Sequence, residues 1–422
     1  MNIRDVAYNL IIEWDRNTTY PNLALKKALR VVQNERDRRF ISAVVYGVVE
    51  KKITLDHFIT KCSDRSPAKM DVEIRSALRM GIYQMFYMSV PASAACNTTV
   101  ELVKQHRFAH SSGFVNAVLR KCDREKKQLL ALKKADYSVR FSISPTLVDL
   151  LLEQYGKETF LSIIENITMI DNSVYLFHNL KKGDKNSFIE ALKKDGITVS
   201  STEVPHLYRS ETGFPVENSV AYRNGWYHII GKNSAKAAAF VPKDAKSILD
   251  LCAAPGGKTF AIAALTECPI RAFDVHPHKI DIIDDGARRL GHSNIQSAYL
   301  DSSVHNGALD NSADFILCDV PCSGLGIMGK KPDIKYKEYD SRSFTDLQYK
   351  ILNNASAYLR AGGRIVYSTC TLDRRENEDQ IQKFLNEHPD FSMDATALEN
   401  GFQTFLPSNG EDGFFIAVLR KA

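Results

Sequence analysis

The feature that most limits the fold is a regular alternation of short apolar runs with helical segments after residue 247. The runs read SILDLC, IRAFDV, ADFILCDV, GRIVYSTC and GFFIAVLRK. Strands separated by helices form a parallel, doubly wound sheet, which binds its ligands at the carboxyl ends of the strands. The last run follows the turn-rich segment LPSNGEDG, so we expect it to join the sheet as an antiparallel strand. We therefore predict a Rossmann-like α/β domain.

The first part of the chain has a different pattern, in which apolar residues recur at the spacing of a helix. Its predicted helices include 70–88, 92–107 and 112–122. From residue 172 the pattern changes to strand, helix and strand, which is typical of a small α+β segment.

These patterns predict a multidomain chain with three parts. We expect an all-α domain at 1–135, a small α+β subdomain at 140–235 and the α/β domain at 236–422. The first boundary precedes Ser144 and Pro145, which form a good N-cap and first-turn proline for a new helix.

Basic residues are concentrated in the first third of the chain. Residues 1–140 hold 25 Lys and Arg against 14 Asp and Glu, whereas the whole chain has a formal net charge of only +5. A basic module on a near-neutral body is typical of proteins that bind a polyanion such as RNA. Solvated lysines on helix faces would give the same charge, so composition alone does not decide between these interpretations.

Cysteine usage and hydropathy exclude other classes of protein. The eight Cys are scattered without a CxxC pair, which argues against a disulfide framework and against a zinc site. The longest uncharged stretch, 80–100, contains Gln84, Pro91 and Asn97 and is too polar to span a membrane. The N-terminal segment MNIRDVAYNLIIEWDR resembles an amphipathic helix more than a signal peptide. We expect a cytoplasmic protein with no metal site and no membrane partner.

A glycine turn lies in SILDLCAAPGGKT, residues 247–259, between a predicted strand and a predicted helix. Glycines there let backbone amides approach a ligand, with a helix N-terminus behind them. A phosphate-binding loop would need glycine six residues before Lys258, where the chain has Cys252, and the dinucleotide motif G-x-G-x-x-G is absent. A nucleoside-binding methyltransferase turn and a purely structural turn remain.

Acidic residues end the next two predicted strands. Asp274 ends IRAFDV, where a carboxylate can accept both hydroxyls of a ribose. Asp301 ends SAYLD, where its carboxylate could hydrogen-bond an adenine amino group. Each is an ordinary strand-end residue by itself, but acids that end successive strands favour a nucleoside site.

Two cysteines lie where the fourth and fifth predicted strands end, in DVPCSG (319–324) and YSTCTL (367–372). We therefore expect Cys322 and Cys370 to face the same ligand crevice. The segment from Asp373 to Glu376 has the pattern of a capping box that opens a helix. A helix N-terminus near a thiol lowers its pKa and favours the nucleophilic thiolate.

Cytosine is a substrate that needs such a thiolate. Carbon 5 of cytosine is a poor nucleophile until a thiolate adds to carbon 6, after which it can take a methyl group from a sulfonium donor. Loss of the carbon 5 proton then expels the enzyme. Asp319, which precedes Pro321 and Cys322, is placed to hold the ring N3 during the addition.

With these motifs the chain resembles the RsmB/Sun branch of the RNA cytosine-5 methyltransferases over essentially its whole length. LDLCAAPGGKT resembles the donor-binding turn of that family, DVPCSG its fourth motif and YSTCT its nucleophile motif; KPDIKY and EDGFF also have counterparts. GIYQMFY with VPASAA, and GFVNAVLRK, resemble the NusB-like RNA-binding domain that this branch carries in front. Bacterial members act on small-subunit ribosomal RNA, at the cytosine numbered 967.

The resemblance implies a role for each motif residue. Cys370 would be the nucleophile at carbon 6, Cys322 would serve product release, and Asp319 would contact both the cytosine and the methionine end of the donor. S-adenosylmethionine would be held by Asp274 and Asp301, by Asp319, and by the turn residues Cys252, Ala253, Ala254, Pro255, Gly256, Gly257 and Lys258. The all-α domain and the α+β subdomain would bind RNA, with 16S ribosomal RNA as the leading partner.

Two other functions stay open at this point. The same chemistry could act on a transfer RNA or on another ribosomal cytosine, although the fused NusB-like domain favours the 16S target. The chain could also be a non-catalytic RNA-binding assembly factor. The presence of both cysteines and of all the donor-site acids argues against this alternative. The chain departs from the family pattern at GKNSAK (231–236) and at Leu176–Asn179, where an expected arginine is missing.

Overall fold

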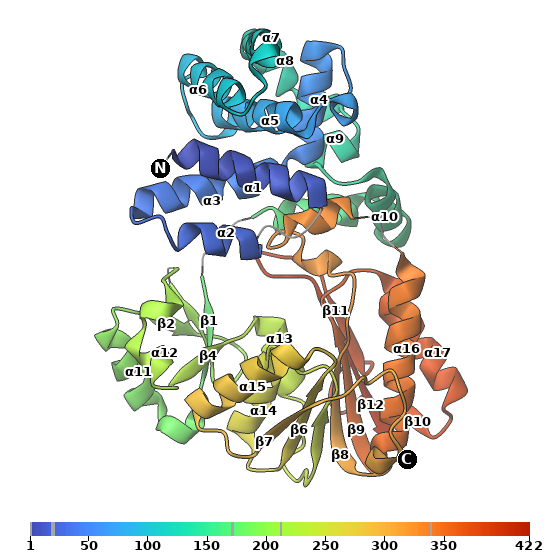
Figure 1. Ribbon diagram of the computed structural model, residues 1–422. Coiled ribbons are helices and arrows are strands. Elements are labelled where there is room, and N and C mark those ends of the chain that lie inside the picture. Colours follow the sequence, from blue (N-terminus) through green and yellow to red (C-terminus); the bar gives the residue numbers. More distant parts are fainter. Residues whose placement is uncertain (1, 18–21, 170–172, 212, 338–339) are drawn as a thin grey trace. The chain divides into compact units, whose positions relative to one another are not determined.

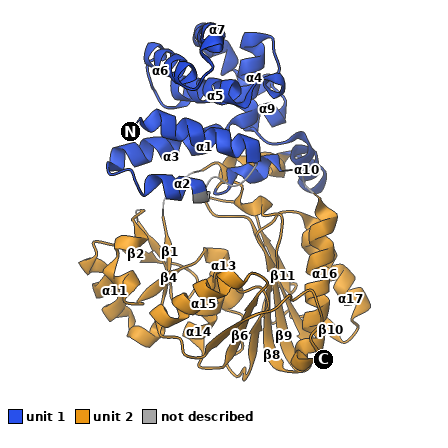
Figure 2. Cartoon of the chain, viewed as in Figure 1, with its two compact units in different colours: residues 1–157, 330–339 blue, residues 158–329, 340–422 orange. Residues whose placement is uncertain are grey.

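Two compact units make up the protein, and Figure 2 shows them in different colours. The computed structural model describes residues 2–17, 22–169, 173–211, 213–337 and 340–422. The helical unit contains residues 1–157 and 330–339, and the sheet unit contains residues 158–329 and 340–422.

The helical unit is built from α-helices and short 3-10 turns. Its helices are α1 (Ile3–Asn17), α2 (Asn22–Leu29), α3 (Glu35–Glu50), α4 (Lys52–Ser63), α5 (Val72–Tyr87), α6 (Ala92–Gln105), α7 (Ser112–Arg124), α8 (Lys126–Leu129), α9 (Tyr137–Phe141) and the first part of α10 (Pro145–Ile167). The predicted helices 70–88, 92–107 and 112–122 correspond to α5, α6 and α7, which confirms the all-α prediction for this region.

Helical periodicity explains the core of this unit. Val44, Val45 and Val48 lie on one face of α3 and pack with Leu78 and Leu119 of α5 and α7 in a single apolar cluster. No helix within the described ranges is long and apolar enough to cross a membrane.

The helical unit also includes a short segment from much later in the chain. Residues 330–339 carry the 3-10 helix η8 (Pro332–Tyr336), which packs with α3. The Tyr336 hydroxyl donates to the Glu50 carbonyl at 2.6 Å, and the Ser144 N–H donates to the Lys335 carbonyl at 2.9 Å. The segment KPDIKY is therefore part of the helical unit.

A small antiparallel sheet forms the first part of the sheet unit. Its strands are β1 (Tyr175–His178), β2 (Val199–Ser201), β3 (Leu207–Ser210) and β4 (Tyr227–Ile229), in the order β2-β3-β1-β4. The helices of this region are α11 (Lys185–Lys194), α12 (Val220–Arg223) and α13 (Lys232–Ala238). The predicted strand–helix–strand pattern of the middle segment is thus present.

A second, larger sheet carries the motifs (Figure 1). Its strands have the order β10-β12-β9-β8-β5-β6-β7, and β11 pairs with β12. The strands are β5 (Ile248–Asp250), β6 (Ile270–Asp274), β7 (Ile295–Tyr299), β8 (Ala313–Asp319), β9 (Leu359–Thr369), β10 (Phe391–Met393), β11 (Phe402–Phe405) and β12 (Phe414–Lys421). The helices between them are α14 (Gly257–Leu265), α15 (Pro277–Leu290), α16 (Ser341–Tyr358) and α17 (Glu378–Glu387). Strands β5 to β9 are parallel, and β12 joins β9 in the antiparallel direction, so the predicted topology is confirmed.

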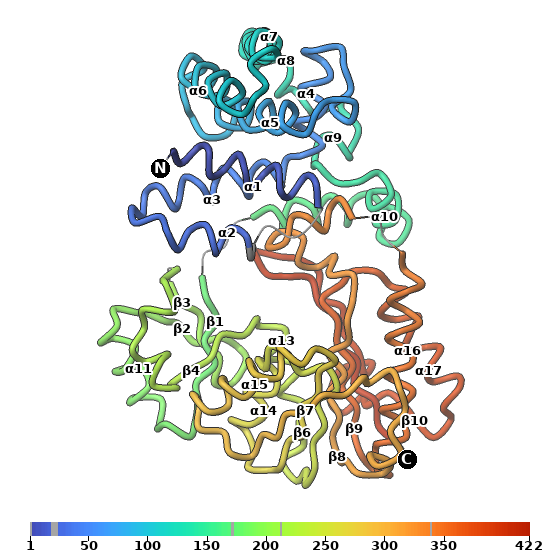
Figure 3. Tube along the Cα trace, in the orientation of Figure 1, coloured from blue at the N-terminus to red at the C-terminus, as the bar shows by residue number. Residues whose placement is uncertain are grey.

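Helices cover both faces of this sheet, because its strands present apolar side chains on both sides. Ile316 and Ile365 pack in one cluster with residues of α16 and α17, whereas their neighbours Leu317 and Val366 pack in another with residues of α14. Phe177 of the small sheet belongs to the α14 cluster, so the two sheets share a core within this unit. The tube in Figure 3 follows the chain through this arrangement, with α17 and β10 toward its red end.

Candidate active site

The predicted glycine turn lies at the carboxyl end of β5 and leads into α14. Gly256 has φ +106°, and a Cβ at this position would lie 2.3 Å from the Phe260 ring, so both the backbone and the space require glycine. Asp250, the last residue of β5, holds the start of α14 in place, because its Oδ2 accepts a hydrogen bond from the Thr259 hydroxyl at 2.6 Å. Burial raises the pKa of Asp250 to about 7.

Asp274 connects the end of β6 to the glycine turn. Its carboxylate is buried and accepts hydrogen bonds from the Ala254 N–H at 3.3 Å and from the His276 N–H at 2.9 Å. Asp301 lies two residues beyond the end of β7, and its Oδ1 accepts from the N–H and the hydroxyl of Ser303. Asp274 thus ends β6 and Asp301 follows the end of β7, so both acids lie at the carboxyl ends of adjacent parallel strands.

Asp319 is the last residue of β8 and meets a lysine from the glycine turn. Its Oδ2 lies 2.7 Å from Lys258 Nζ, and its Oδ1 accepts a hydrogen bond from the Ser368 hydroxyl at 2.8 Å. Strand register explains the second contact, because Asp319 is paired with Ser368 of β9. Lys258 Nζ also lies 5.4 Å from the centre of the Phe414 ring, within the range of a cation–π contact.

The two cysteines that the sequence placed at strand ends are in direct contact. Cys322 follows β8, Cys370 follows β9, and their Sγ atoms are 3.3 Å apart. Close passage of the backbone at Gly326 supports this arrangement: its N–H donates to the Cys370 carbonyl at 2.9 Å, and a Cβ there would lie 2.1 Å from the Gly413 carbonyl oxygen. Two thiols and a lysine–aspartate pair therefore come from adjacent strand ends of one sheet.

Burial suppresses the ionisation of three thiols at this site. The contact with Cys370 and burial together raise the pKa of the Cys322 thiol well above its usual value. Cys322 therefore keeps its proton at neutral pH. Burial likewise raises the pKa of Cys252 and of Cys318, so these thiols remain neutral.

The predicted capping box after Cys370 is wrong. Asp373 does accept a hydrogen bond from a backbone N–H, that of Arg375, but it caps only the 3-10 helix η9 (Arg374–Glu376). Helix α17 begins later, at Glu378. The Asp373 N–H, which a capping box would pair with Glu376, donates to the Thr371 hydroxyl oxygen at 3.3 Å. The Glu376 carboxylate bonds to Ser323 and Gln348 instead.

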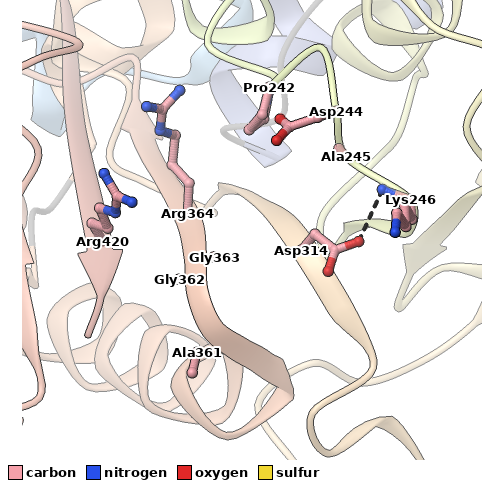
Figure 4. A pocket seen from close by; sticks show the side chains of 10 residues that line it. All are labelled: Pro242, Asp244, Ala245, Lys246, Asp314, Ala361, Gly362, Gly363, Arg364 and Arg420. Atoms are coloured by element: carbon pink, nitrogen blue, oxygen red, sulfur yellow. Dashed lines mark hydrogen bonds between the residues drawn. The ribbon is translucent and has the colours of Figure 1, made fainter.

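A cavity of about 350 Å³ lies at the other end of the same sheet. Its walls include Lys246, which precedes β5, Asp314 at the start of β8, and Arg364 and Arg420 (Figure 4). Figure 4 also shows the hydrogen bond from the Lys246 N–H to Asp314, which is 2.9 Å long. This cavity is near the amino ends of β5 and β8, away from the strand ends that carry the motifs.

Known proteins with similar sequences share this combination of parts. The 16S rRNA methyltransferase RsmB/F family matches residues 237–420, and the NusB family matches residues 1–124. A Bacillus subtilis (strain 168) protein named "Probable ribosomal RNA small subunit methyltransferase B" is 32% identical, over 100% of this chain and 99% of that protein. A Synechocystis protein of the same name is 30% identical over 100% of both chains. The crystal structure of PH0851 has a TM-score of 0.79 over 99% of each chain at 22% identity, which shows a shared fold.

Proposed function

Since the chain belongs to the RsmB/F family of ribosomal RNA methyltransferases in its NusB-fused form, we propose that it methylates carbon 5 of a cytosine in 16S ribosomal RNA. The methyl donor is S-adenosylmethionine, and the reaction takes place in the cytoplasm. The observation that carries the proposal is the contact of 3.3 Å between the Sγ atoms of Cys322 and Cys370 at adjacent strand ends.

We assign the nucleophile to Cys370. Its Sγ forms a bond to carbon 6 of the cytosine, and the electron pair of the carbon 5–carbon 6 double bond makes carbon 5 nucleophilic. Carbon 5 then takes the methyl group. A water molecule takes the carbon 5 proton, the electron pair of that carbon–hydrogen bond restores the double bond, and the electron pair of the Sγ–carbon 6 bond leaves on Cys370 as its thiolate. Cys322 assists this last step, and Asp319 holds the ring N3 during the addition.

The residues around the glycine turn suit S-adenosylmethionine. A carboxylate has about four lone-pair sites, and the two backbone amides on Asp274 leave acceptors for the ribose hydroxyls. Cys252 to Lys258 form the turn beside it, and Asp301 is assigned to the adenine. When bound, this donor supplies an electrophilic methyl group. Asp319 would contact its methionine end, and Lys258 would hold the donor as part of the turn.

The test is a methyl-transfer assay on purified RNA. The protein is incubated with 16S ribosomal RNA and methyl-labelled S-adenosylmethionine, the RNA is digested, and the labelled nucleosides are separated. We expect 5-methylcytidine from the wild type and none from Cys370→Ala. Cys268→Ala is the matched control, because Cys268 is a buried cysteine after α14 outside the site.

Each alternative gives a different result in this assay. Bisulfite sequencing then locates the modified cytosine. Label that enters only transfer RNA keeps the reaction and replaces the target. Labelled product from Cys370→Ala contradicts the nucleophile assignment. RNA binding without any methylated nucleoside supports the non-catalytic assembly factor instead.

A further inference from the structure

Glu376 is a fully buried carboxylate whose partners lie beside the active-site cysteines. Its Oε2 accepts hydrogen bonds from the Ser323 N–H at 3.0 Å and from Gln348 Nε2 at 2.8 Å. Its Oε1 accepts one from the Ser323 hydroxyl at 2.5 Å. Since Ser323 directly follows Cys322, two of these three bonds hold the residue next to that thiol.

The contacts continue to both sides of the cysteine pair. Gln348 Nε2 also donates to the Pro321 carbonyl at 2.8 Å, so Glu376 and Gln348 together hold the residues before and after Cys322. The Ser323 and Thr371 hydroxyl oxygens are 2.6 Å apart. Because the Ser323 hydroxyl donates to Glu376, the Thr371 hydroxyl is the donor in this bond. Thr371 directly follows Cys370, so one network links the two cysteine segments.

The two cysteines depend on this network to different degrees. Cys370 follows the last residue of β9, and that strand is paired on both sides, with β8 and with β12, as far as Ser368 and Thr369. Cys322 lies beyond the end of β8, in a loop that has no strand partner. Glu376 therefore does more to fix Cys322 than to fix Cys370.

A buried carboxylate is unfavourable unless donors compensate it, and here the Ser323 N–H, the Ser323 hydroxyl and Gln348 Nε2 all connect the Glu376 carboxylate to the Cys322 segment. We propose that Glu376 is a positioning residue that fixes Cys322 against Cys370. The inference rests on the proposed function, in which Cys322 serves release. Loss of the Glu376 acceptors then slows product release much more than the first methyl transfer.

The test compares two substitutions of the same residue. Glu376→Met keeps the length of the side chain and removes every acceptor. Glu376→Gln keeps the network, because its amide oxygen can accept from Ser323 N–H and Gln348, and its amide nitrogen can donate to the Ser323 hydroxyl oxygen. We expect Glu376→Met to lower kcat about 100-fold, to leave the single-turnover rate of methyl transfer nearly unchanged and to accumulate a denaturation-resistant protein–RNA adduct. Glu376→Gln restores turnover.

Two further variants separate positioning from folding. Asp394→Leu removes another buried carboxylate of the sheet unit, one that bonds Arg364 and not the cysteine segments, and it accumulates no adduct. Ser323→Ala removes the hydroxyl bonds to Glu376 and Thr371 and should show the same defect in a milder form, even if Glu376→Met does not fold.

Several outcomes overturn the inference. These are an equal fall in single-turnover rate and kcat without adduct, a defect in Glu376→Gln as large as in Glu376→Met, and normal turnover by Glu376→Met. If the wild type itself methylates no cytosine, the proposed function is wrong, and the Glu376 variants cannot be compared. Failure of the proposed function is thus distinguishable from failure of the Glu376 inference.

Discussion

The two ends of the large sheet use the same residue types in opposite ways. At the amino end, Arg364 of β9 donates to Asp394 at 2.6 Å, and Arg360 donates to Asp314 at 3.0 Å. At the carboxyl end, Lys258 lies 2.7 Å from Asp319. Acids and bases therefore meet at both ends.

The pKa shifts show the difference. Burial opposes ionisation of Asp394 and Asp314, yet hydrogen bonds from Thr396 and Arg364, and from the Lys246 backbone and Arg360, lower the pKa of these two acids. At the carboxyl end, burial raises the pKa of Asp250 to about 7. Donors fix the charge of Asp394 and Asp314 at the amino end, whereas Asp250 at the carboxyl end can change its protonation near neutral pH.

Substitution of Cys322, at the carboxyl end of the sheet, should have the largest effect on activity. We expect Cys322→Ala to abolish turnover, a loss of about 1,000-fold or more, because in the proposed mechanism the second thiol assists release from the Cys370 adduct. Denaturing gel electrophoresis after incubation with RNA and S-adenosylmethionine should show a protein–RNA adduct. A variant that turns over normally, or that stalls without adduct, would remove Cys322 from the release step.

The largest effect at the amino end should concern stability alone. Arg364→Met leaves the buried Asp394 carboxylate without its guanidinium partner, so we expect the free energy of unfolding to fall by about 3–5 kcal/mol. Urea denaturation measures this loss. Methyl transfer per folded molecule should stay at the wild-type level. A selective loss of activity in this variant would mean that the two ends are coupled.

A pH series separates the two ends more sharply. The pKa of Asp250 is about 7 in the folded protein, against 3.8 for an unperturbed Asp in the unfolded chain. Between pH 3.8 and pH 7 the folded state therefore binds more protons than the unfolded state, and the protein loses stability as pH rises through this range. Relative to the wild type, Asp250→Asn should therefore gain about 2–4 kcal/mol in the free energy of unfolding between about pH 5 and about pH 8.

Asp394→Asn is the control for this series. The folded-state pKa of Asp394 is lowered, so the stability from this acid is complete above its unfolded pKa and is lost only as pH falls through the folded pKa. The free energy of unfolding that Asp394→Asn loses should therefore be the same at about pH 5 and at about pH 8. Parallel stability curves for Asp250→Asn and the wild type would contradict the assigned protonation of Asp250.

The smallest expected effect is that of Arg360→Ala. Its partner Asp314 also accepts hydrogen bonds from two backbone N–H groups, and the Arg360 side chain is 45% exposed. Water screens such a pair, so the free energy of unfolding should change by less than about 1 kcal/mol. A loss as large as that of Arg364→Met would show that exposure does not separate these two pairs.

Local sequence patterns predicted the parts of the site that depend on neighbours along the chain. Continuous apolar runs mark the buried parallel strands, and glycines and acids mark the turns that follow them, so the strands and their motif-bearing ends follow from the sequence. The contact between Cys322 and Cys370 follows in turn, because parallel neighbouring strands bring their carboxyl ends together.

Contacts between distant segments could not be predicted in this way. The pattern at Asp373–Glu376 is that of a capping box, but Ser323 and Gln348 compete for the same carboxylate, and they are remote in sequence. Phe177 stands where the family pattern has an arginine, and the next residue, His178, is another such case. It is buried and stacks on Phe188 with ring centres 4.4 Å apart, and burial lowers its pKa to about 4. Its neutral ring serves packing, which no local pattern reveals.

Residues 330–339 have a consequence for how the two units could be exchanged or separated. A fragment that ends at residue 157 lacks Tyr336, whose hydroxyl donates to Glu50, and the complementary fragment carries Tyr336 without its helices. One cut therefore yields two incomplete pieces. Grafting the helical unit onto another catalytic protein requires two grafts, one at the N-terminus and one inside the loop that follows Cys322. Descent by simple end-to-end gene fusion would have left this second attachment to evolve afterwards.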